Sequence, residues 1–246
     1  MKSIYTLPIS FSLALLGEHA LGSSCTTAGP QSPRDITQKS GSNQVQWAKA
    51  LPYKKMNLCN IHFHKNAEHK GLDFSKLEGK GDNEGYTCKQ AKGAAGSKSK
   101  TRSCKDLEAG DTIEVHWVYT SCDVKPGEGL GSCASESCVN PSLRVEGRVF
   151  YLADKGIDFG NLSKDFNKLS LPEKGNMVEY LGSTTGPKYT ASKCSPYQVT
   201  WRVDNACQAL DITSLDQFCK NNPFNEDHAH GVRKLVKNPK LLSIAK

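Results

Sequence analysis

The sequence predicts a mainly β protein that folds as a single domain. Its 246 residues include 21 glycines and 11 prolines, which favour turns, whereas stretches with helical periodicity are few. Several segments carry the alternation and the β-branched or aromatic residues that are typical of strands. No internal repeat or composition shift marks a domain boundary. With 37% hydrophobic and 23% charged residues, the composition excludes a multi-span membrane protein and a wholly disordered chain.

Charge and cysteine content narrow the class of protein further. The net charge of +7 is modest and scattered along the chain, so we expect no nucleic-acid partner. Ten cysteines indicate an oxidising compartment, and the absence of a Cys-x-x-Cys pair argues against a zinc ribbon or a thioredoxin-like redox centre. We therefore expect structural disulfides. Their connectivity stays open, although Cys133 and Cys138 are close enough in sequence to form a local bridge.

The N-terminal residues 1–22 resemble a signal peptide. Lys2 supplies a positive charge, residues 4–16 are largely apolar, and residues 20–22 read Ala-Leu-Gly, as at a small-residue cleavage site. The apolar run is too short to span a bilayer, and no later segment is long and apolar enough. A frayed strand, a poorly matched anchor and a lipoprotein acylated at Cys25 are weaker readings. We predict a secreted or periplasmic protein without a membrane span.

The mature chain begins with a tail and continues as one domain. Residues 23–44 are rich in Ser, Thr, Gly, Pro and Gln, and we interpret them as a linker or a tied-down tail before the domain of residues 45–246. Residues 57–64 alternate as a strand does, and the alternation places four side chains on one face, namely Leu58, Asn60, His62 and His64. Residues 79–105 carry many Gly, Lys and Ser residues and are interpreted as a solvated basic loop.

Three further strands and a helix are expected downstream. Residues 111–120 are rich in β-branched and aromatic residues, and this strand would carry on one face Glu114, His116 and Val118. Residues 144–152 and 197–203 are the other strand candidates. Residues 211–221 have a helical pattern with Leu215 and Phe218 on one side, and either Thr213 or Ser214 is the expected N-cap.

Three histidines on the first two strands form a candidate metal site. His62 and His64 project from the same side of one strand, so both imidazoles can reach one point. His116 can complete the set if its strand lies alongside. Three neutral nitrogen donors suit a catalytic zinc, which keeps one position for water. A His-x-His pair alone is weak evidence, because half-buried histidines are common in strands.

Two neighbouring polar residues strengthen the metal hypothesis. Asn60 lies two residues before His62, and Glu114 lies two residues before His116. Each therefore lies on the same face of its strand as the histidine that follows it. Each side chain can accept a hydrogen bond from a ligand imidazole and fix its tautomer. A glutamate on the inner face of an apolar strand needs such a partner in any case.

At these residues the sequence resembles the carbonic anhydrases. Residues 60–64, 67–69 and 113–117 are similar to the metal-site segments of the α-class, and residues 180–187 and 197–201 look like the strand and loop that close its active site. Residues 230–233, which end in Arg233, match an Arg-containing C-terminal motif. The short spacing from His64 to Glu68 and the cysteine-rich middle look most like the δ-class.

The resemblance implies a fold, a cofactor and a reaction. The fold would be a large, twisted, mostly antiparallel sheet with a few short peripheral helices. His62, His64 and His116 would bind Zn²⁺, and the enzyme would hydrate carbon dioxide reversibly to bicarbonate by a metal-bound hydroxide. Asn60 and Glu114 would hold the ligand histidines.

The remaining roles also come from the resemblance. Glu68 would hold the hydroxyl of a loop threonine that orients the hydroxide; Thr185 matches this threonine best, and Thr184 is one register step away. Val118 and Trp201 would line the apolar pocket for carbon dioxide. No histidine matches a proton-shuttle position.

Three rival hypotheses use the same residues differently. In a cupin-like metal oxygenase, Glu68 would join the three histidines as a fourth ligand, but the Gly-turn and the Pro-x-Gly-x-x-His segment of that class are missing. A secreted disulfide-rich protein that binds zinc without catalysis would close the site with a fourth protein ligand. A catalytically inactive relative is disfavoured because the three histidines are intact.

Overall fold

The structure is a computed structural model that describes most of the chain after the N-terminal segment. It describes residues 23–25, 27–38, 41–45, 47–94, 96–97, 99–163, 177–185, 189, 192–232 and 236–245. The predicted signal peptide of residues 1–22 and the motif residue Arg233 lie outside the described residues.

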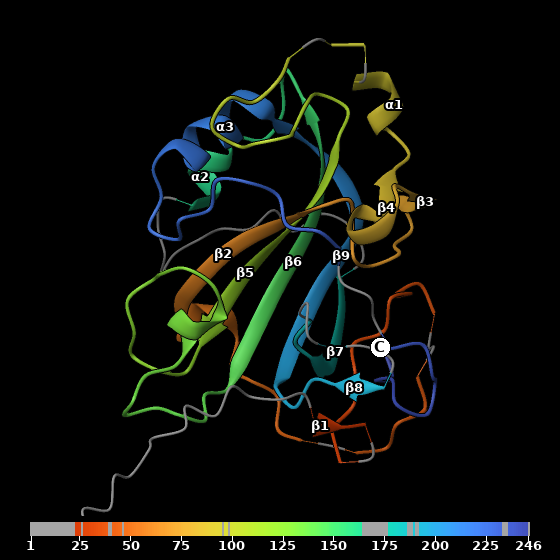
Figure 1. Cartoon of the computed structure of the whole chain (residues 1–246), viewed down its shortest axis with the longest axis vertical. Coiled ribbons are helices and arrows are strands. Elements are labelled where there is room, and N and C mark those ends of the chain that lie inside the picture. Colours follow the sequence, from red (N-terminus) through yellow and green to blue (C-terminus); the bar gives the residue numbers. More distant parts are fainter. Residues whose placement is uncertain are drawn as a thin grey trace, which may run out of the picture.

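A five-stranded sheet forms the centre of the molecule (Figure 1). Its strands, in spatial order, are β2 (Asn57–Lys65), β5 (Thr112–Thr120), β6 (Leu143–Ala153), β9 (Gln198–Asp211) and β7 (Met177–Ser183). Only β6 and β9 pair in parallel within this sheet; the other three pairs are antiparallel. The mainly β, mostly antiparallel prediction is therefore confirmed. The last predicted strand is longer than expected, because β9 continues to Asp211.

Small elements surround the sheet. Two-stranded pairs are formed by β1 (Ser23–Ser24) with β8 (Lys193–Cys194), and by β3 (Phe74–Glu78) with β4 (Gly85–Cys88). The helices are short: α1 (Ala91–Ala94), α2 (Phe159–Ser163), α3 (Ile212–Lys220), and the 3₁₀ turns Tyr53–Lys55, Gly81–Asn83 and Leu130–Cys133. Among the described helices, none combines the length and the apolar character that crossing a membrane needs.

One face of the sheet packs against α2 and α3. Trp117 and Phe150 on the sheet join Phe159, Leu215 and Phe218 of the helices in one buried cluster. The N-cap of α3 differs from the prediction, because it is the carboxylate of Asp211 that accepts hydrogen bonds from the backbone N–H groups of Thr213 (2.7 Å) and Ser214 (3.0 Å). An ionised cap is well placed at the positive end of a helix.

A β-bulge changes the faces of β2. The pairing with β5 skips from Leu58 opposite Tyr119 to Asn60 opposite Val118. Leu58 therefore packs in the same cluster as Ile61 and Phe63, and the prediction that it shares a face with Asn60 is wrong. The extra residue of the bulge reverses the alternation at this point. Beyond the bulge, the alternation places the histidines on the other face as predicted.

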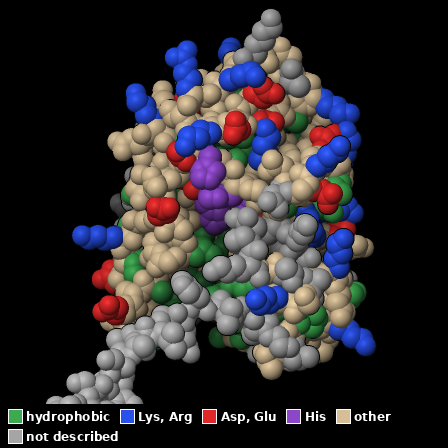
Figure 2. All heavy atoms as spheres, viewed as in Figure 1, with side chains coloured by type: hydrophobic (Ala, Val, Ile, Leu, Met, Phe, Trp, Pro, Cys, Tyr) green, Lys and Arg blue, Asp and Glu red, His purple; other side chains and the backbone are tan. Residues whose placement is uncertain are grey.

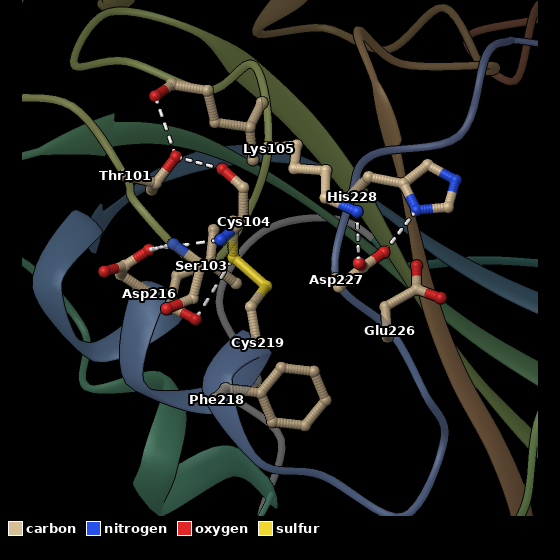
Figure 3. The surroundings of a disulfide bond; sticks show 12 residues. Thr101, Ser103, Cys104, Lys105, Asp216, Phe218, Cys219, Glu226, Asp227 and His228 are labelled. Atoms are coloured by element: carbon tan, nitrogen blue, oxygen red, sulfur yellow. Dashed lines mark hydrogen bonds and ion pairs between the residues drawn. A yellow bond between two sulfur atoms is a disulfide. The ribbon is translucent and has the colours of Figure 1, made fainter.

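The segment 79–105 is not the plain loop that its composition suggested. It contains β4 and α1, and disulfides anchor it through Cys88 and Cys104. Figure 3 shows the second anchor, where the Cys104–Cys219 bond joins the segment to α3 and the carboxylate of Asp216 faces the backbone of Ser103 and Cys104. Local composition carries no information about these distant partners.

All ten cysteines form disulfides, and together they tie distant parts of the chain. The pairs are Cys25–Cys194, Cys59–Cys133, Cys88–Cys207, Cys104–Cys219 and Cys122–Cys138. The local bridge that proximity in sequence allows between Cys133 and Cys138 is not formed, because Cys133 pairs with Cys59 on β2 and Cys138 pairs with Cys122 after β5. Five disulfides indicate folding in an oxidising compartment.

The segment that follows the N-terminal residues runs beside the C-terminal segment. Cys25 is bonded to Cys194, and the backbone of Gln31 exchanges hydrogen bonds with Leu241 and Ser243, both 2.8 Å. Residues 31–33 are buried as a result. Part of residues 23–44 is thus fixed to the body of the molecule.

Candidate metal centre

The register of two antiparallel strands brings the three histidines together. His62 on β2 lies directly opposite His116 on β5, and His64 lies opposite Glu114. Directly opposed side chains on one face are close neighbours. The Nε2 atom of His62 is 3.2 Å from Nδ1 of His116, and one ring nitrogen from each of the three histidines lies within 4.8 Å of the others.

The donor set fits a zinc ion. The Nε2 atom of His64 is buried and has no hydrogen-bond partner among the described residues, which is costly for a polar group unless a ligand occupies the site. Burial lowers the pKa of His64 to about 4, so its imidazole is neutral and available as a ligand at neutral pH. Three neutral imidazoles are a typical set for catalytic zinc.

Hydrogen bonds at the Nδ1 atoms orient two of the imidazoles. The Nδ1 atom of His62 lies 2.7 Å from Oδ1 of Asn60, and Nδ1 of His64 lies 3.0 Å from the carbonyl oxygen of Gly231. If each Nδ1 carries the proton, each Nε2 is left with a lone pair that faces the centre. Asn60 thus lies where the sequence hypothesis needs it, while Gly231 could not be foreseen from spacing.

A buried network fixes the third imidazole. Glu114 accepts from Nε2 of His116 (2.9 Å) and from Nδ1 of His69 (2.6 Å), and His69 in turn contacts the hydroxyl of Tyr180 (2.7 Å). The same carboxylate accepts from the backbone N–H groups of Glu68 (2.7 Å) and His69 (3.1 Å). Burial alone would raise the pKa of Glu114, but His69 and His116 hold it well below its ordinary value.

His69 and Tyr180 were not among the predicted site residues. They close the network around Glu114, and both are buried. His69, Glu114 and His116 also form a second group of potential metal ligands. Because Glu114 lies at hydrogen-bond distance from both rings, the second group is already satisfied as a hydrogen-bonded network. The only sequence signal for His69 was its position directly after Glu68.

The two adjacent threonines have different partners. The hydroxyl of Thr185 lies 3.3 Å from both carboxylate oxygens of Glu68, whereas the hydroxyl of Thr184 lies 2.8 Å from that of Ser195. Glu68 is fully buried, and its Oε1 atom is 3.6 Å from Nε2 of His64. The structure therefore brings Thr185, Glu68 and the histidine centre together.

A cavity of about 330 Å³ opens onto the histidine centre. His62 and His64 lie at its base, and a polar rim surrounds it, including Glu226, His228 and His230. His230 contacts Glu226 (3.1 Å) and lies 4.9 Å from His228 between ring centroids. Figure 2 shows histidine side chains gathered on this face of the molecule, with charged side chains on one side of them and apolar side chains on the other.

An apolar cavity of about 650 Å³ adjoins the first one. The two cavities share Leu130 and Thr185. Val118 and Trp201, the predicted carbon dioxide wall, lie together in a buried cluster, and the Trp201 ring is 5.1 Å from that of His116. They are thus placed on the inner side of the centre rather than in the lining of either cavity.

Comparison with known proteins places this chain in a family. Residues 53–214, more than half of the chain, match the family model described as delta carbonic anhydrase. No curated protein sequence matches the chain.

Solved structures similar to this one are α-carbonic anhydrases and a related enzyme. The enzyme of Thermovibrio ammonificans, in complex with sulfanilamide, is 15% identical with a TM-score of 0.33 and matches 85% of this chain and 87% of its own. That of Photobacterium profundum is 15% identical with a TM-score of 0.36, covering 90% of each chain. A halotolerant carbonic anhydrase from Dunaliella salina is 14% identical with a TM-score of 0.39, covering 90% and 88%. On its match to the family model, the chain belongs to the delta carbonic anhydrase family and is a carbonic anhydrase, an enzyme that interconverts carbon dioxide and bicarbonate.

Proposed function

We propose that hydration of carbon dioxide by this protein depends on zinc held by His62, His64 and His116. The observation that carries the proposal is the convergence of three imidazole nitrogens within 4.8 Å, one of them a buried Nε2 that has no hydrogen-bond partner among the residues that the structure describes. In the described part of the chain, this group contains three side chains and no fourth. Three protein ligands are typical of catalytic zinc, whereas structural zinc has four.

The metal supplies one part of the chemistry and the chain supplies the rest. Zinc brings the pKa of a bound water close to neutrality, as is established for carbonic anhydrases, and so makes a nucleophile available. Thr185 donates its hydroxyl proton to the buried carboxylate of Glu68. The Thr185 oxygen can then act only as an acceptor towards the centre, and this fixes the direction in which a nucleophile donates its own proton.

We assign the inner apolar wall of the carbon dioxide site to Val118 and Trp201, although neither side chain lines the two cavities at the centre. Both are buried in one cluster, and the Trp201 indole is held by its N–H bond to the Ser183 carbonyl (3.1 Å) and packs against His116. Carbon dioxide carries no net charge or dipole, so an apolar surface beside the centre favours it over bicarbonate. Release of the charged product is favoured for the same reason.

The rival functions need contacts that differ from these. A cupin-like centre requires Glu68 as a ligand, but this carboxylate is engaged by Thr185 and is not part of the group formed by the three histidines. A closed zinc-binding site requires a fourth ligand in that group. The family match also favours the hydratase over both alternatives.

Zinc content tests the ligand assignment. We expect the purified protein to hold one zinc per chain and His116→Ala to lose most of it, because one of three donors is removed. His228→Ala is the matched control, since this histidine is on the rim of the same cavity but outside the ligand group. Retention of stoichiometric zinc by His116→Ala, measured by atomic emission, would remove His116 from the site.

Export to an oxidising compartment completes the proposal. The five disulfides support such a compartment, and we propose that residues 1–22 are the signal peptide that leads there. The intact mass of the protein recovered from the medium or periplasm is expected to correspond to a chain that starts near Ser23. A mass that includes residues 1–22 would contradict cleavage.

A further inference from the structure

The loop between β5 and β6 is held by two disulfides beside the histidine centre. Cys122–Cys138 closes this loop on itself, and Cys59–Cys133 ties it to β2. Gly129 and Leu130 of the loop line the cavity over the histidines. We call residues 122–138 the bridged loop.

The anchor on β2 is the bulge residue. The pairing of β2 with β5 skips Cys59, so the bulge frees its carbonyl group from the ladder. Two groups of the bridged loop donate hydrogen bonds to that carbonyl oxygen, namely the N–H of Gly127 (3.0 Å) and the hydroxyl of Ser132 (2.8 Å). Its side chain, which is fully buried, forms the disulfide to Cys133. The loop is thus fixed to Cys59 through three separate bonds.

Asn60, the next residue, links the bridged loop to the histidine centre. The Nδ2 atom of Asn60 donates to the carbonyl oxygen of Gly127 (3.0 Å), while its Oδ1 atom faces Nδ1 of His62 (2.7 Å). The Gly127 carbonyl can pair only with the N–H₂ end of the amide, so it selects the orientation in which the amide oxygen points at His62. His62 must then carry its proton on Nδ1, which leaves Nε2 for the metal.

We propose that the bridged loop, anchored by the Cys59–Cys133 disulfide, is a positioning element that sets Asn60 and through it the tautomer and orientation of His62. The proposal rests on the proposed zinc site. The disulfide Cys104–Cys219 lacks this connection, because it packs with α3 in the cluster on the opposite face of the sheet. Loss of Cys59–Cys133 is therefore expected to weaken metal retention specifically.

The test compares the zinc release rates of two disulfide variants. Cys59→Ala with Cys133→Ala removes the proposed positioning bond, and Cys104→Ala with Cys219→Ala is the matched control. The two bonds close segments of 74 and 115 residues, so the chain-entropy account predicts similar losses of thermal stability. Zinc-loaded protein is mixed with a chromophoric chelator, and melting temperatures are recorded alongside. We expect about tenfold faster release from the first variant and less than a twofold change in the control.

A double-mutant cycle tests whether the effect passes through Asn60. Asn60→Ala alone is expected to speed zinc release about tenfold, because it removes the acceptor for His62. Adding the Cys59 and Cys133 substitutions to this variant should then add less than twofold, since both changes act on one connection. Multiplicative effects would show that the disulfide acts on the centre by another route and would overturn the proposal.

Failure of the positioning role and failure of the zinc site give different results. Equal release rates in the two disulfide variants would overturn the positioning role, whereas a parent protein without stoichiometric zinc would refute the zinc site itself. Should the first variant fail to fold, Ser132→Ala loosens the same loop while both disulfides remain, because it removes one donor to the Cys59 carbonyl. We expect about threefold faster release from Ser132→Ala, and an unchanged rate would contradict the proposal.

Discussion

The hydroxyls of Thr184 and Thr185 have different partners, and we propose that only Thr185 takes part in catalysis. Thr185 reaches Glu68, and Thr184 reaches Ser195. We predict that Thr185→Ala lowers kcat/KM for carbon dioxide hydration by roughly 10- to 100-fold, in the range of a lost positioning contact. Thr184→Ala is the matched control: it should cost about 1 kcal/mol of stability and change kcat/KM far less. Stopped-flow hydration and thermal unfolding are measured for both variants. A larger loss of kcat/KM in Thr184→Ala than in Thr185→Ala would assign the catalytic role to Thr184 instead.

We propose that Glu68 acts on Thr185 as a hydrogen-bond acceptor. In Glu68→Gln the side chain keeps its shape, but its N–H₂ group can donate to Thr185 and free the threonine proton to point at the centre. We predict that zinc content is unchanged while kcat falls by about 10-fold or more. Zinc analysis and stopped-flow hydration on the same sample separate the two effects. Unchanged turnover would exclude Glu68 from the mechanism.

At the scale of the element, the carboxylate of Asp216 on α3 holds the segment next to Cys104. It accepts from the backbone N–H groups of Arg102 (2.7 Å), Ser103 (2.6 Å) and Cys104 (3.1 Å). Partial burial alone would raise the pKa of Asp216, but these donors hold it below its ordinary value. We predict that Asp216→Asn lowers the free energy of unfolding by about 1–2 kcal/mol near pH 7.

The sign of the pH dependence follows from the lowered pKa. The stabilisation by Asp216 is present above the unfolded-state pKa, which is near 4, and is lost as the pH falls through the lower folded-state pKa. The difference between the parent and Asp216→Asn, measured by urea unfolding, should therefore shrink as the pH falls below the unfolded-state pKa. A difference that stays constant over this range would show that the carboxylate charge is not involved.

The faces of β2 show how far a single element can be predicted. Strand alternation placed Asn60, His62 and His64 on one face, because this depends only on the backbone between neighbouring residues. It placed Leu58 on the wrong face, since the bulge at Cys59 is stabilised by the bridged loop more than 60 residues away. Local periodicity contains no information about such a partner.

For the whole molecule, the disulfide framework is the part that sequence alone left open. Ten cysteines allow many pairings, and proximity in sequence suggested a bridge from Cys133 to Cys138 that the fold does not contain. Peptide mapping under non-reducing conditions is expected to recover Cys59–Cys133 and Cys122–Cys138 as separate linked pairs. A peptide that links Cys133 directly to Cys138 would contradict the framework described here.

The site as a whole was predictable to the extent that it lies on two neighbouring strands. The three histidines, Asn60 and Glu114 follow from spacing along those strands, and the resemblance added Glu68 and the threonine pair. The contact between His69 and Tyr180 became visible only through the fold, because β7 and the turn after β2 meet across the sheet. The contacts of the bridged loop with Cys59 and Asn60 also became visible only through the fold.

We propose that carbon dioxide hydration by this chain depends on zinc at the three histidines. Stopped-flow hydration of the mature, disulfide-intact protein, before zinc is stripped, after stripping and after zinc is restored, tests this dependence. We predict that activity disappears with the metal and returns with zinc at one equivalent per chain. Activity that persists in metal-free protein, or its absence from folded and fully zinc-loaded protein, would refute the dependence on zinc.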